Sequence, residues 1–183
     1  MVSIDEIPEP QRQLLNDIEA EWRARSSRHS DRGASADGTG AAGLFVLFVG
    51  PSGSGKTMAA ELLARRLHLG LYRVDLSVVL SKYIGETEKN LERIFEEAER
   101  TGAILFFEEA DALFGKRTEV KDSHDRYGNV EVAYMLERMK AFRGLAILAT
   151  NARSGIDDAF LRRIRQVVPF ASPVGGDSSE LND

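Results

Sequence analysis

Hydrophobic residues occur along this chain in two patterns, short apolar runs and positions spaced by three or four. The runs predict five strands, at 44–49, 71–75, 103–107, 145–149 and 166–170. The spaced positions predict helices between the strands, at 58–67, 86–100, 128–142 and 157–165. The most regular helix is 86–100, and Gly102 is expected to end it. Its apolar side chains are Leu91, Ile94, Phe95 and Ala98.

Strands that alternate with helices are typical of α/β proteins, in which helices cover both faces of a parallel sheet. Residues 44–170 are therefore expected to form a three-layer αβα core with a mainly parallel, five-stranded sheet. Residues 1–22 predict a short amphipathic helix with apolar positions at Leu14, Leu15, Ile18 and Trp22. The polar stretch 23–43 lacks apolar periodicity and predicts a flexible linker, and 171–183 predict a frayed tail.

Composition narrows the class of protein. Of the 183 residues, 43% are hydrophobic and 29% are charged, as in ordinary soluble globular proteins. The sequence contains no apolar run long enough to span a membrane and no signal-peptide pattern. It also lacks cysteine, which excludes disulfides and thiolate metal sites, so we expect a cytoplasmic protein. The net charge of −5 argues against a nucleic-acid binder.

A glycine-rich run lies between the first strand and the helix that follows it, which is the context in which G-x-x-x-x-G-K-[ST] binds phosphates. Glycines let backbone N–H groups point inward, and the helix N-terminus adds partial positive charge. We expect Lys56 to reach the β- and γ-phosphates and the Thr57 hydroxyl to bind Mg²⁺. The alternative is a turn that binds nothing. The expected nucleotide-binding residues are Gly50, Pro51, Ser52, Gly53, Ser54, Gly55, Lys56, Thr57 and Met58.

Two adjacent carboxylates, Glu108 and Glu109, follow the strand at 103–107. Open α/β sheets bind their ligands at the carboxyl ends of the strands. Magnesium takes hard oxygen ligands and a hydrolytic water needs a base, so such a pair can serve both. We expect Glu108 to face the metal and Glu109 to face the water. An ordinary acidic strand end is the alternative.

Together with Leu148-Ala149-Thr150-Asn151, these two motifs resemble the Walker A, Walker B and sensor-1 motifs of AAA+ ATPases, within their AAA clade. The resemblance covers residues 44–170 and implies a P-loop NTPase core that uses ATP and Mg²⁺. It implies that Glu109 is the catalytic base, that Lys56 contributes to catalysis, and that Asn151 orients the attacking water. A turn-forming asparagine is the alternative at position 151.

The segment 157–165 resembles the part of these enzymes that carries arginine fingers, which enter the site of a neighbouring subunit. The resemblance therefore implies a homo-oligomeric ring, usually a hexamer. Arg162 and Arg165 are the favoured fingers, and Arg163 is their rival. The alternative for each arginine is a solvated basic helix end.

The run Lys82-Tyr83-Ile84 resembles the first pore loop of protein-remodelling AAA enzymes, in which an aromatic side chain grips an extended polypeptide. The resemblance implies a protein substrate or assembly partner, whereas a half-buried tyrosine is the alternative. The charged stretch 116–127 could form a second pore-facing loop, or a metal site built from Glu119, Asp122, His124 and Asp125. The runs Asp111–Arg117 and Asp122–Tyr127 resemble a narrower group, the AAA ATPases encoded alongside bacterial extracellular contractile injection systems.

The sequence departs from the family pattern at two places. Walker B ends in Glu108-Glu109 rather than Asp-Glu, and the longer metal-side carboxylate is expected to crowd the site and slow hydrolysis. After Phe170, residues 171–183 are too few and too polar for the helical lid of the family. We therefore expect the lid to be missing, either from the gene or because the sequence is a fragment.

The expected function is Mg²⁺-dependent ATP hydrolysis that remodels or helps assemble a protein partner. The alternative is an ATP-binding adaptor or switch subunit with weak or no hydrolysis. Glu108 and the missing lid favour this alternative, whereas Glu109 and Asn151 favour the enzyme. A DNA-associated AAA loader is a third hypothesis, which the acidic net charge disfavours.

Overall fold

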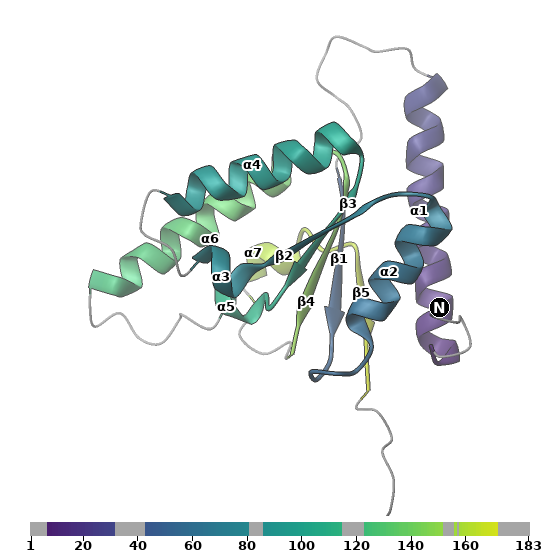
Figure 1. Cartoon of the computed structure of the whole chain (residues 1–183), viewed down its shortest axis with the longest axis horizontal. Coiled ribbons are helices and arrows are strands. Elements are labelled where there is room, and N and C mark those ends of the chain that lie inside the picture. Colours follow the sequence, from purple (N-terminus) through teal and green to yellow (C-terminus); the bar gives the residue numbers. More distant parts are fainter. Residues whose placement is uncertain are drawn as a thin grey trace, which may run out of the picture.

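Figure 1 shows the protein, a computed structural model, as a central sheet between two groups of helices. The structure describes residues 7–31, 43–80, 86–114, 123–151, 156 and 158–171. For residues 28–31, 114 and 123–129, the backbone alone is described. Within these ranges no helix is both long and apolar enough to cross a membrane.

The sheet consists of parallel strands in the order β2-β3-β4-β1-β5. These strands are β1 (Leu44–Val49), β2 (Leu71–Asp75), β3 (Ile104–Glu108), β4 (Leu145–Thr150) and β5 (Gln166–Pro169). The α/β class and the parallel five-stranded sheet expected from the sequence are confirmed, and each strand boundary lies within one residue of its expected position. Runs of apolar residues locate these strands well because helices cover both faces of the sheet.

Helices connect the strands. In the described residues they are α1 (Glu9–Asp31), α2 (Lys56–Leu67), α3 (Leu76–Leu80), α4 (Glu86–Thr101), α5 (Asp111–Phe114), α6 (Ser123–Ala141) and α7 (Asp158–Leu161). Gly102 ends α4 with a φ of 67°, as expected for a glycine just after a helix. The sequence did not predict α3 and α5, because helices of about one turn are too short to show a periodic pattern.

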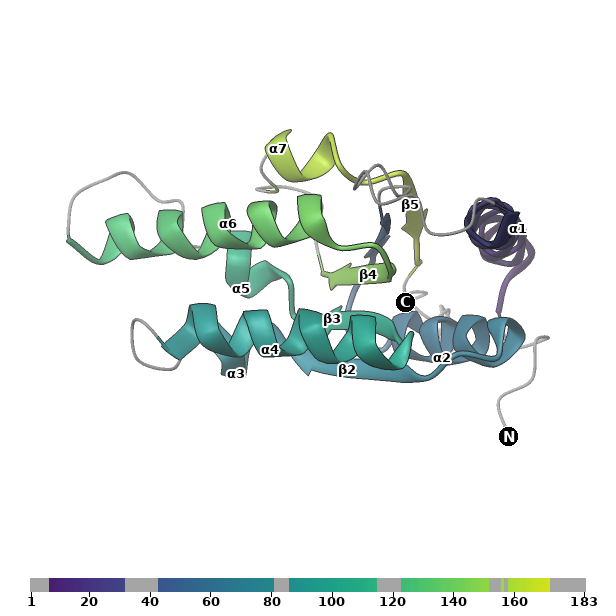
Figure 2. The same cartoon turned by 90° about the horizontal axis from the view of Figure 1, so that it is seen from above.

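Two apolar layers lie on opposite faces of the sheet, because successive side chains of a strand point to opposite sides. On one face, α1 and α2 cover side chains such as Phe48 and Phe106. On the other face, α3 to α7 cover side chains such as Leu105 and Phe107, and the Phe95 ring of α4 lies 5.6 Å from the Phe107 ring. Figures 1 and 2 show these two groups of helices on either side of the strands, which confirms the three-layer αβα arrangement.

The N-terminal helix α1 is longer than expected, and the linker prediction is wrong for residues 23–31, which continue the helix. Two ion pairs between residues four apart support this stretch, Glu19–Arg23 at 2.9 Å and Glu21–Arg25 at 2.8 Å. Arg23 also donates a hydrogen bond to the backbone oxygen of Arg66 in α2 at 2.9 Å. Because these contacts are polar, the search for apolar periodicity could not detect them. Residues 32–42 of the expected linker lie outside the described residues.

Helix α1 packs against α2 and β5. Leu15 and Ile18 are fully buried in the same apolar layer as α2. Gln11 Nε2 donates a hydrogen bond to the backbone oxygen of Pro169 at 2.5 Å, and Gln166 Nε2 donates one to the backbone oxygen of Leu14 at 3.2 Å. The N-terminal helix is therefore attached to the sheet at its edge strand.

Two further helices differ from the expected boundaries. Helix α6 begins at Ser123, five residues before the start of the helix expected at 128–142. Its first turns are polar, and a polar turn extends a helix without adding an apolar position. Helix α7 has four residues rather than the nine of 157–165, and Arg162 and Arg163 lie in the turn that follows it.

Candidate active site

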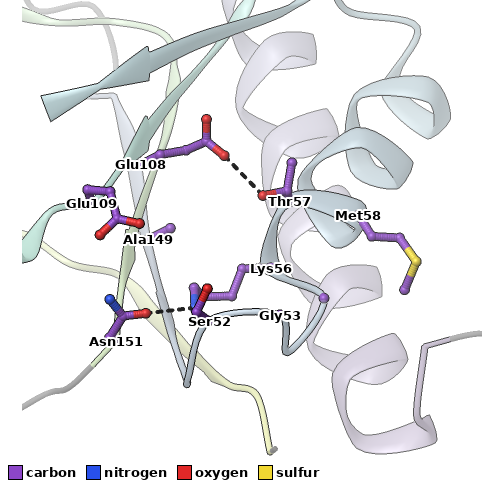
Figure 3. Close-up of a pocket in the computed structure, with 10 residues that line it drawn as sticks. Ser52, Gly53, Lys56, Thr57, Met58, Glu108, Glu109, Ala149 and Asn151 are labelled. Atoms are coloured by element: carbon purple, nitrogen blue, oxygen red, sulfur yellow. Dashed lines mark hydrogen bonds between the residues drawn. The ribbon is translucent and has the colours of Figure 1, made fainter. Parts of the chain in front are cut away.

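A cavity of about 370 Å³ opens at the carboxyl edge of the sheet, where the ends of β1, β3 and β4 lie next to one another. The loop after β1, the end of β3 and the end of β4 each contribute residues to it (Figure 3). The lining residues are Ser52, Gly53, Gly55, Lys56, Thr57, Met58, Glu108, Glu109, Ala149 and Asn151. The structure thus brings together the three segments that the sequence singled out.

The loop between β1 and α2 has the backbone of an anion-binding turn. Gly53 and Gly55 have φ angles of 76° and 95°, which glycine adopts far more readily than other residues. Helix α2 starts directly afterwards at Lys56, and the first N–H groups of a helix lack partners within the helix. Ser54 Oγ is buried and has no hydrogen-bond partner among the described residues. The loop therefore offers donors and partial positive charge to an anion.

Lys56 crosses the cavity from α2 towards the end of β4. Its Nζ donates hydrogen bonds to the backbone oxygens of Gly50 and Pro51, the latter at 2.9 Å, and lies 3.5 Å from Asn151 Oδ1. Partial burial lowers the pKa of Lys56 below 10.5, and the nearby carboxylates of Glu109 and Asp111 oppose that shift. The ammonium group is held against the loop that forms the floor of the cavity.

Thr57 and Glu108 form a pair of oxygen donors beside this loop. Thr57 Oγ1 donates a hydrogen bond to Glu108 Oε1 at 3.0 Å (Figure 3). Magnesium commonly takes one or two protein oxygens and completes its octahedron with phosphate and water. In the part of the chain that the structure describes, no group of three or more His, Asp or Glu forms an all-protein metal site. The donor set therefore fits an Mg²⁺ ion that enters with a nucleotide.

Glu109 has a left-handed backbone, with a φ of 53°, which is uncommon for a residue other than glycine. Consecutive side chains of an extended strand point to opposite faces, so a change of backbone conformation at Glu109 is consistent with both glutamates lining the same cavity. In Figure 3, Glu108 points towards Thr57, whereas Glu109 lies on the side of the cavity that Asn151 occupies. The two carboxylates therefore face different parts of the cavity.

Two residues that connect the segments of this site by hydrogen bonds, Asp111 and Arg73, were not singled out from the sequence. Asp111 accepts hydrogen bonds from the Thr150 hydroxyl at 2.6 Å and from the Asn151 backbone N–H at 2.9 Å. Arg73 on β2 donates hydrogen bonds to both carboxylate oxygens of Glu108. An acidic residue two positions after the Glu-Glu pair was visible in the sequence, but its partners become apparent only when β3 lies beside β4.

The three arginines considered as fingers do not line the cavity, and Arg165 lies near the amino end of β1. The backbone N–H of Arg165 donates a hydrogen bond to the backbone oxygen of Phe45, near the start of β1, at 2.8 Å. The exposed side chain of Arg165 forms an ion pair with Glu21 of α1 at 3.2 Å, and Arg162 is also exposed. The structure does not bring Arg162, Arg163 or Arg165 to the cavity of their own chain.

Several predicted residues lie outside the described part of the chain. These are Lys82, Tyr83 and Ile84 of the expected pore loop and Glu119 and Asp122 of the alternative metal site. The side chains of His124 and Asp125 are likewise not among those described, and residues 172–183 of the expected tail also lie outside.

Comparison with known proteins agrees with the geometry of the site. The family model described as "ATPase family associated with various cellular activities (AAA)" matches residues 46–172, which include every residue that lines the cavity. The chain belongs to the AAA family. The resemblance that the sequence motifs implied is therefore confirmed at the level of the family.

Similar AAA proteins come from bacteria, fungi and archaea. An uncharacterised AAA family ATPase, y4kL, of Sinorhizobium fredii is 38% identical over 130 residues, which are 70% of this chain and 39% of that protein. The ATPase family gene 2 protein of Schizosaccharomyces pombe is 37% identical over 132 residues, 70% of this chain and 16% of that protein. The proteasome-activating nucleotidase of Methanococcus vannielii is 36% identical over 135 residues, 70% of this chain and 33% of that protein. This AAA chain thus spans between 16% and 39% of the length of these relatives.

Proposed function

We propose that this AAA domain binds ATP with Mg²⁺ and hydrolyses it to remodel or help assemble a protein partner. The observation that carries the proposal is the convergence of Lys56, Glu108, Glu109 and Asn151 on one cavity behind a phosphate-type loop. One of the similar proteins is named a proteasome-activating nucleotidase, and this name refers both to a nucleotide and to a protein partner. ATP rather than GTP is the nucleotide that the family favours.

Each residue of the cavity has a role in this proposal. The loop N–H groups and Lys56 hold the phosphates, and the Thr57 hydroxyl and the Glu108 carboxylate hold Mg²⁺. When bound, the ion supplies neutralisation of charge on the phosphate oxygens. The Glu109 carboxylate accepts a proton from the attacking water, and the Asn151 amide orients that water. Asp111 fixes the position of Asn151 by accepting the hydrogen bond of its backbone N–H.

The second candidate is an ATP-binding adaptor or switch with little hydrolysis. Two observations favour it: the metal-side residue Glu108 is longer than the usual aspartate, and its carboxylate already carries bonds from Thr57 and Arg73. Steady-state ATPase activity across protein concentrations, with Glu109→Gln beside the wild type, separates the two candidates. We expect turnover that rises with concentration and disappears in the variant. Tight ATP binding without turnover in either protein would contradict the ATPase and favour the ATP-binding adaptor or switch.

We propose that Arg162 and Arg165 complete the site of a neighbouring subunit in a homo-oligomeric, hexameric ring. Both side chains are exposed and neither lines the cavity of its own chain, which supports this role. A mixing experiment tests it with two proteins that are inactive alone, Glu109→Gln and the double variant Arg162→Ala/Arg165→Ala. Mixed rings hold sites with an intact glutamate and a neighbour's arginines, so we expect turnover to reappear on mixing. Arg100→Ala, which removes an exposed arginine paired with Glu97, serves as the control.

The narrower resemblance supports a proposal about the partner, namely a contractile injection particle whose assembly or maturation this protein assists. In that role the pore-loop residues Lys82, Tyr83 and Ile84 grip an extended segment of the partner. The test replaces the chromosomal gene with Lys56→Ala and counts assembled particles by electron microscopy. We expect fewer particles. Normal numbers in the Lys56→Ala strain would contradict the proposed partner without affecting the ATPase proposal.

A further inference from the structure

Glu108 is held from two sides. Arg73 Nε donates a hydrogen bond to Glu108 Oε2 at 3.1 Å, and Arg73 Nη2 donates one to Glu108 Oε1 at 2.9 Å. This two-point contact between a guanidinium and a carboxylate is the strong, directional form of the ion pair. Glu108 Oε1 also accepts the hydrogen bond of Thr57 Oγ1. Both oxygens of the proposed metal-binding carboxylate are therefore already engaged.

The strand register explains why Arg73 reaches this position. In the parallel pair of β2 and β3, Arg73 lies opposite Phe106, and Asp75 lies opposite Glu108. Residues two apart on a strand share a face, so Arg73 and Glu108 project from the same face of the sheet, which α2 covers. The extra methylene of a glutamate, relative to the aspartate usual at position 108, extends its carboxylate towards both Arg73 and Thr57.

A second carboxylate lies within reach of the same arginine. Arg73 Nη1 is 3.8 Å from Glu61 Oε1 on α2, and the Arg73 side chain is 51% exposed. A half-exposed side chain with two acceptors can transfer its hydrogen bonds from one to the other without burying an unpaired charge. Glu61 is also paired with Arg65 of the same helix, at 3.6 Å.

We propose that Arg73 and the divalent cation compete for Glu108, so that Arg73 sets how strongly nucleotide binding depends on Mg²⁺. The inference rests on the proposed function, because it concerns the same nucleotide site. A guanidinium and Mg²⁺ beside one carboxylate repel each other, and the two-point contact uses both of its oxygens. Without the cation, Arg73 neutralises Glu108. With the cation bound, Arg73 keeps its ion pair with Glu61. Arg73 is a positioning residue in this scheme.

The test compares the Kd of a fluorescent ADP analogue in EDTA with its Kd in MgCl₂, using the full chain. ADP is used because no hydrolysis disturbs the equilibrium. We expect Arg73→Gln to raise the ratio of the Kd in EDTA to the Kd in MgCl₂ about two- to fivefold, the range that a partly exposed ion pair allows. Without Arg73, Glu108 repels the phosphates in EDTA and binds the cation more freely in MgCl₂. Glu61→Gln is expected to lower the ratio, because Arg73 then lacks its second acceptor.

Arg100→Gln is the matched control, since Arg100 is also an exposed arginine paired with a glutamate, Glu97, but on α4. Its ratio is expected to equal that of the wild type. Arg73→Lys keeps the charge without the two-point geometry, and it is expected to raise the ratio less than Arg73→Gln. If Arg73→Gln does not fold, as judged by thermal unfolding, Arg73→Lys decides the question.

An unchanged or smaller ratio in a folded Arg73 variant would overturn the inference, because Arg73 would then be structural or would assist the cation. The proposed function would survive that result as long as the wild type binds the analogue more tightly in MgCl₂. A wild-type chain that binds no nucleotide, or binds it equally in EDTA, would overturn the proposed function and the inference together.

Discussion

The carboxylate of Asp111 fixes the backbone of Asn151, because Asp111 Oδ2 accepts a hydrogen bond from the Asn151 N–H at 2.9 Å. The other oxygen accepts a hydrogen bond from Thr150 Oγ1 at 2.6 Å, and Thr150 is 1% exposed. The side-chain oxygen of Asn151 in turn lies 3.5 Å from Lys56 Nζ. One carboxylate from the segment after β3 therefore determines where the end of β4 meets the cavity.

Asp111→Ala is expected to lower ATP turnover at least about tenfold while changing ATP affinity much less, because a small displacement of a water-orienting group mainly affects the chemical step. It is also expected to lower the free energy of unfolding by about 1–3 kcal/mol, since buried Thr150 loses an acceptor. Turnover, equilibrium ATP binding and urea unfolding measure the three quantities. Glu97→Gln, an exposed carboxylate paired with Arg100, is the control. Equal losses in affinity and turnover would contradict the positioning role.

Replacement of Glu109 by glycine separates stability from activity. Glu109 and His68 are the two non-glycine residues with positive φ in the described part of the chain, at 53° and 56°. Glycine relieves the strain of that conformation but adds entropy to the unfolded chain, so each substitution is expected to stabilise the fold by about 0.5–1 kcal/mol. Glu109→Gly is expected to abolish turnover, whereas His68→Gly, at the C-terminus of α2, keeps it. Urea unfolding and ATPase assays provide both readouts. Destabilisation by Glu109→Gly would show that its side chain contributes contacts to the fold.

Most of the sheet and the cavity could be predicted from local patterns in the sequence. The loop from Gly50 to Thr57 is contiguous, so its residue types and their spacing indicated a phosphate site without knowledge of the fold. Glu108, Glu109 and Asn151 were found because each follows an apolar run that marks a strand end. In all these cases the functional residues lie within a few positions of the sequence pattern that locates them.

The residues that sequence reasoning missed depend on pairing between distant segments. Arg73 meets Glu108 only because β2 and β3 are parallel neighbours, and Asp111 meets Asn151 only because β3 lies beside β4. The sequence predicted the strands but not their order in the sheet. The helical residues 23–31 were missed for a different reason, since polar ion pairs and a contact with α2 support them in place of an apolar stripe.

Helix α1 is expected to stabilise the domain, because Leu15 is fully buried between α1 and the sheet. Leu15→Ala removes buried methyl groups and leaves a cavity, which is expected to lower the free energy of unfolding by about 2–5 kcal/mol. Val130→Ala, at a side chain that is 50% exposed, is expected to change it by less than about 0.5 kcal/mol. Urea unfolding of both variants measures the difference. A similar small effect for both would mean that α1 is not part of the cooperative unit.

The charge state of Lys56 links nucleotide binding to pH. Burial lowers the pKa of the free Lys56 below 10.5, although Glu109 and Asp111 oppose the shift. Between the lowered pKa and 10.5, the native state binds fewer protons at Lys56 than the unfolded state, so this group makes stability rise with pH in that window. Below both pKa values its contribution is constant. Phosphates favour the charged ammonium, so nucleotide binding near the lowered pKa takes up a proton and weakens as the pH rises.

Affinity for the ADP analogue is therefore expected to fall as the pH rises through the lowered pKa of Lys56, at lower pH than an ordinary lysine would require. Lys56→Arg is the matched control, because a guanidinium stays charged throughout this rise in pH. The variant is expected to bind more weakly at every pH, since the loop is built around an ammonium, but with an affinity that does not change with pH. Calorimetry in two buffers with different ionisation enthalpies measures proton uptake directly. Equal pH dependence in the wild type and in Lys56→Arg would assign the titration to another group.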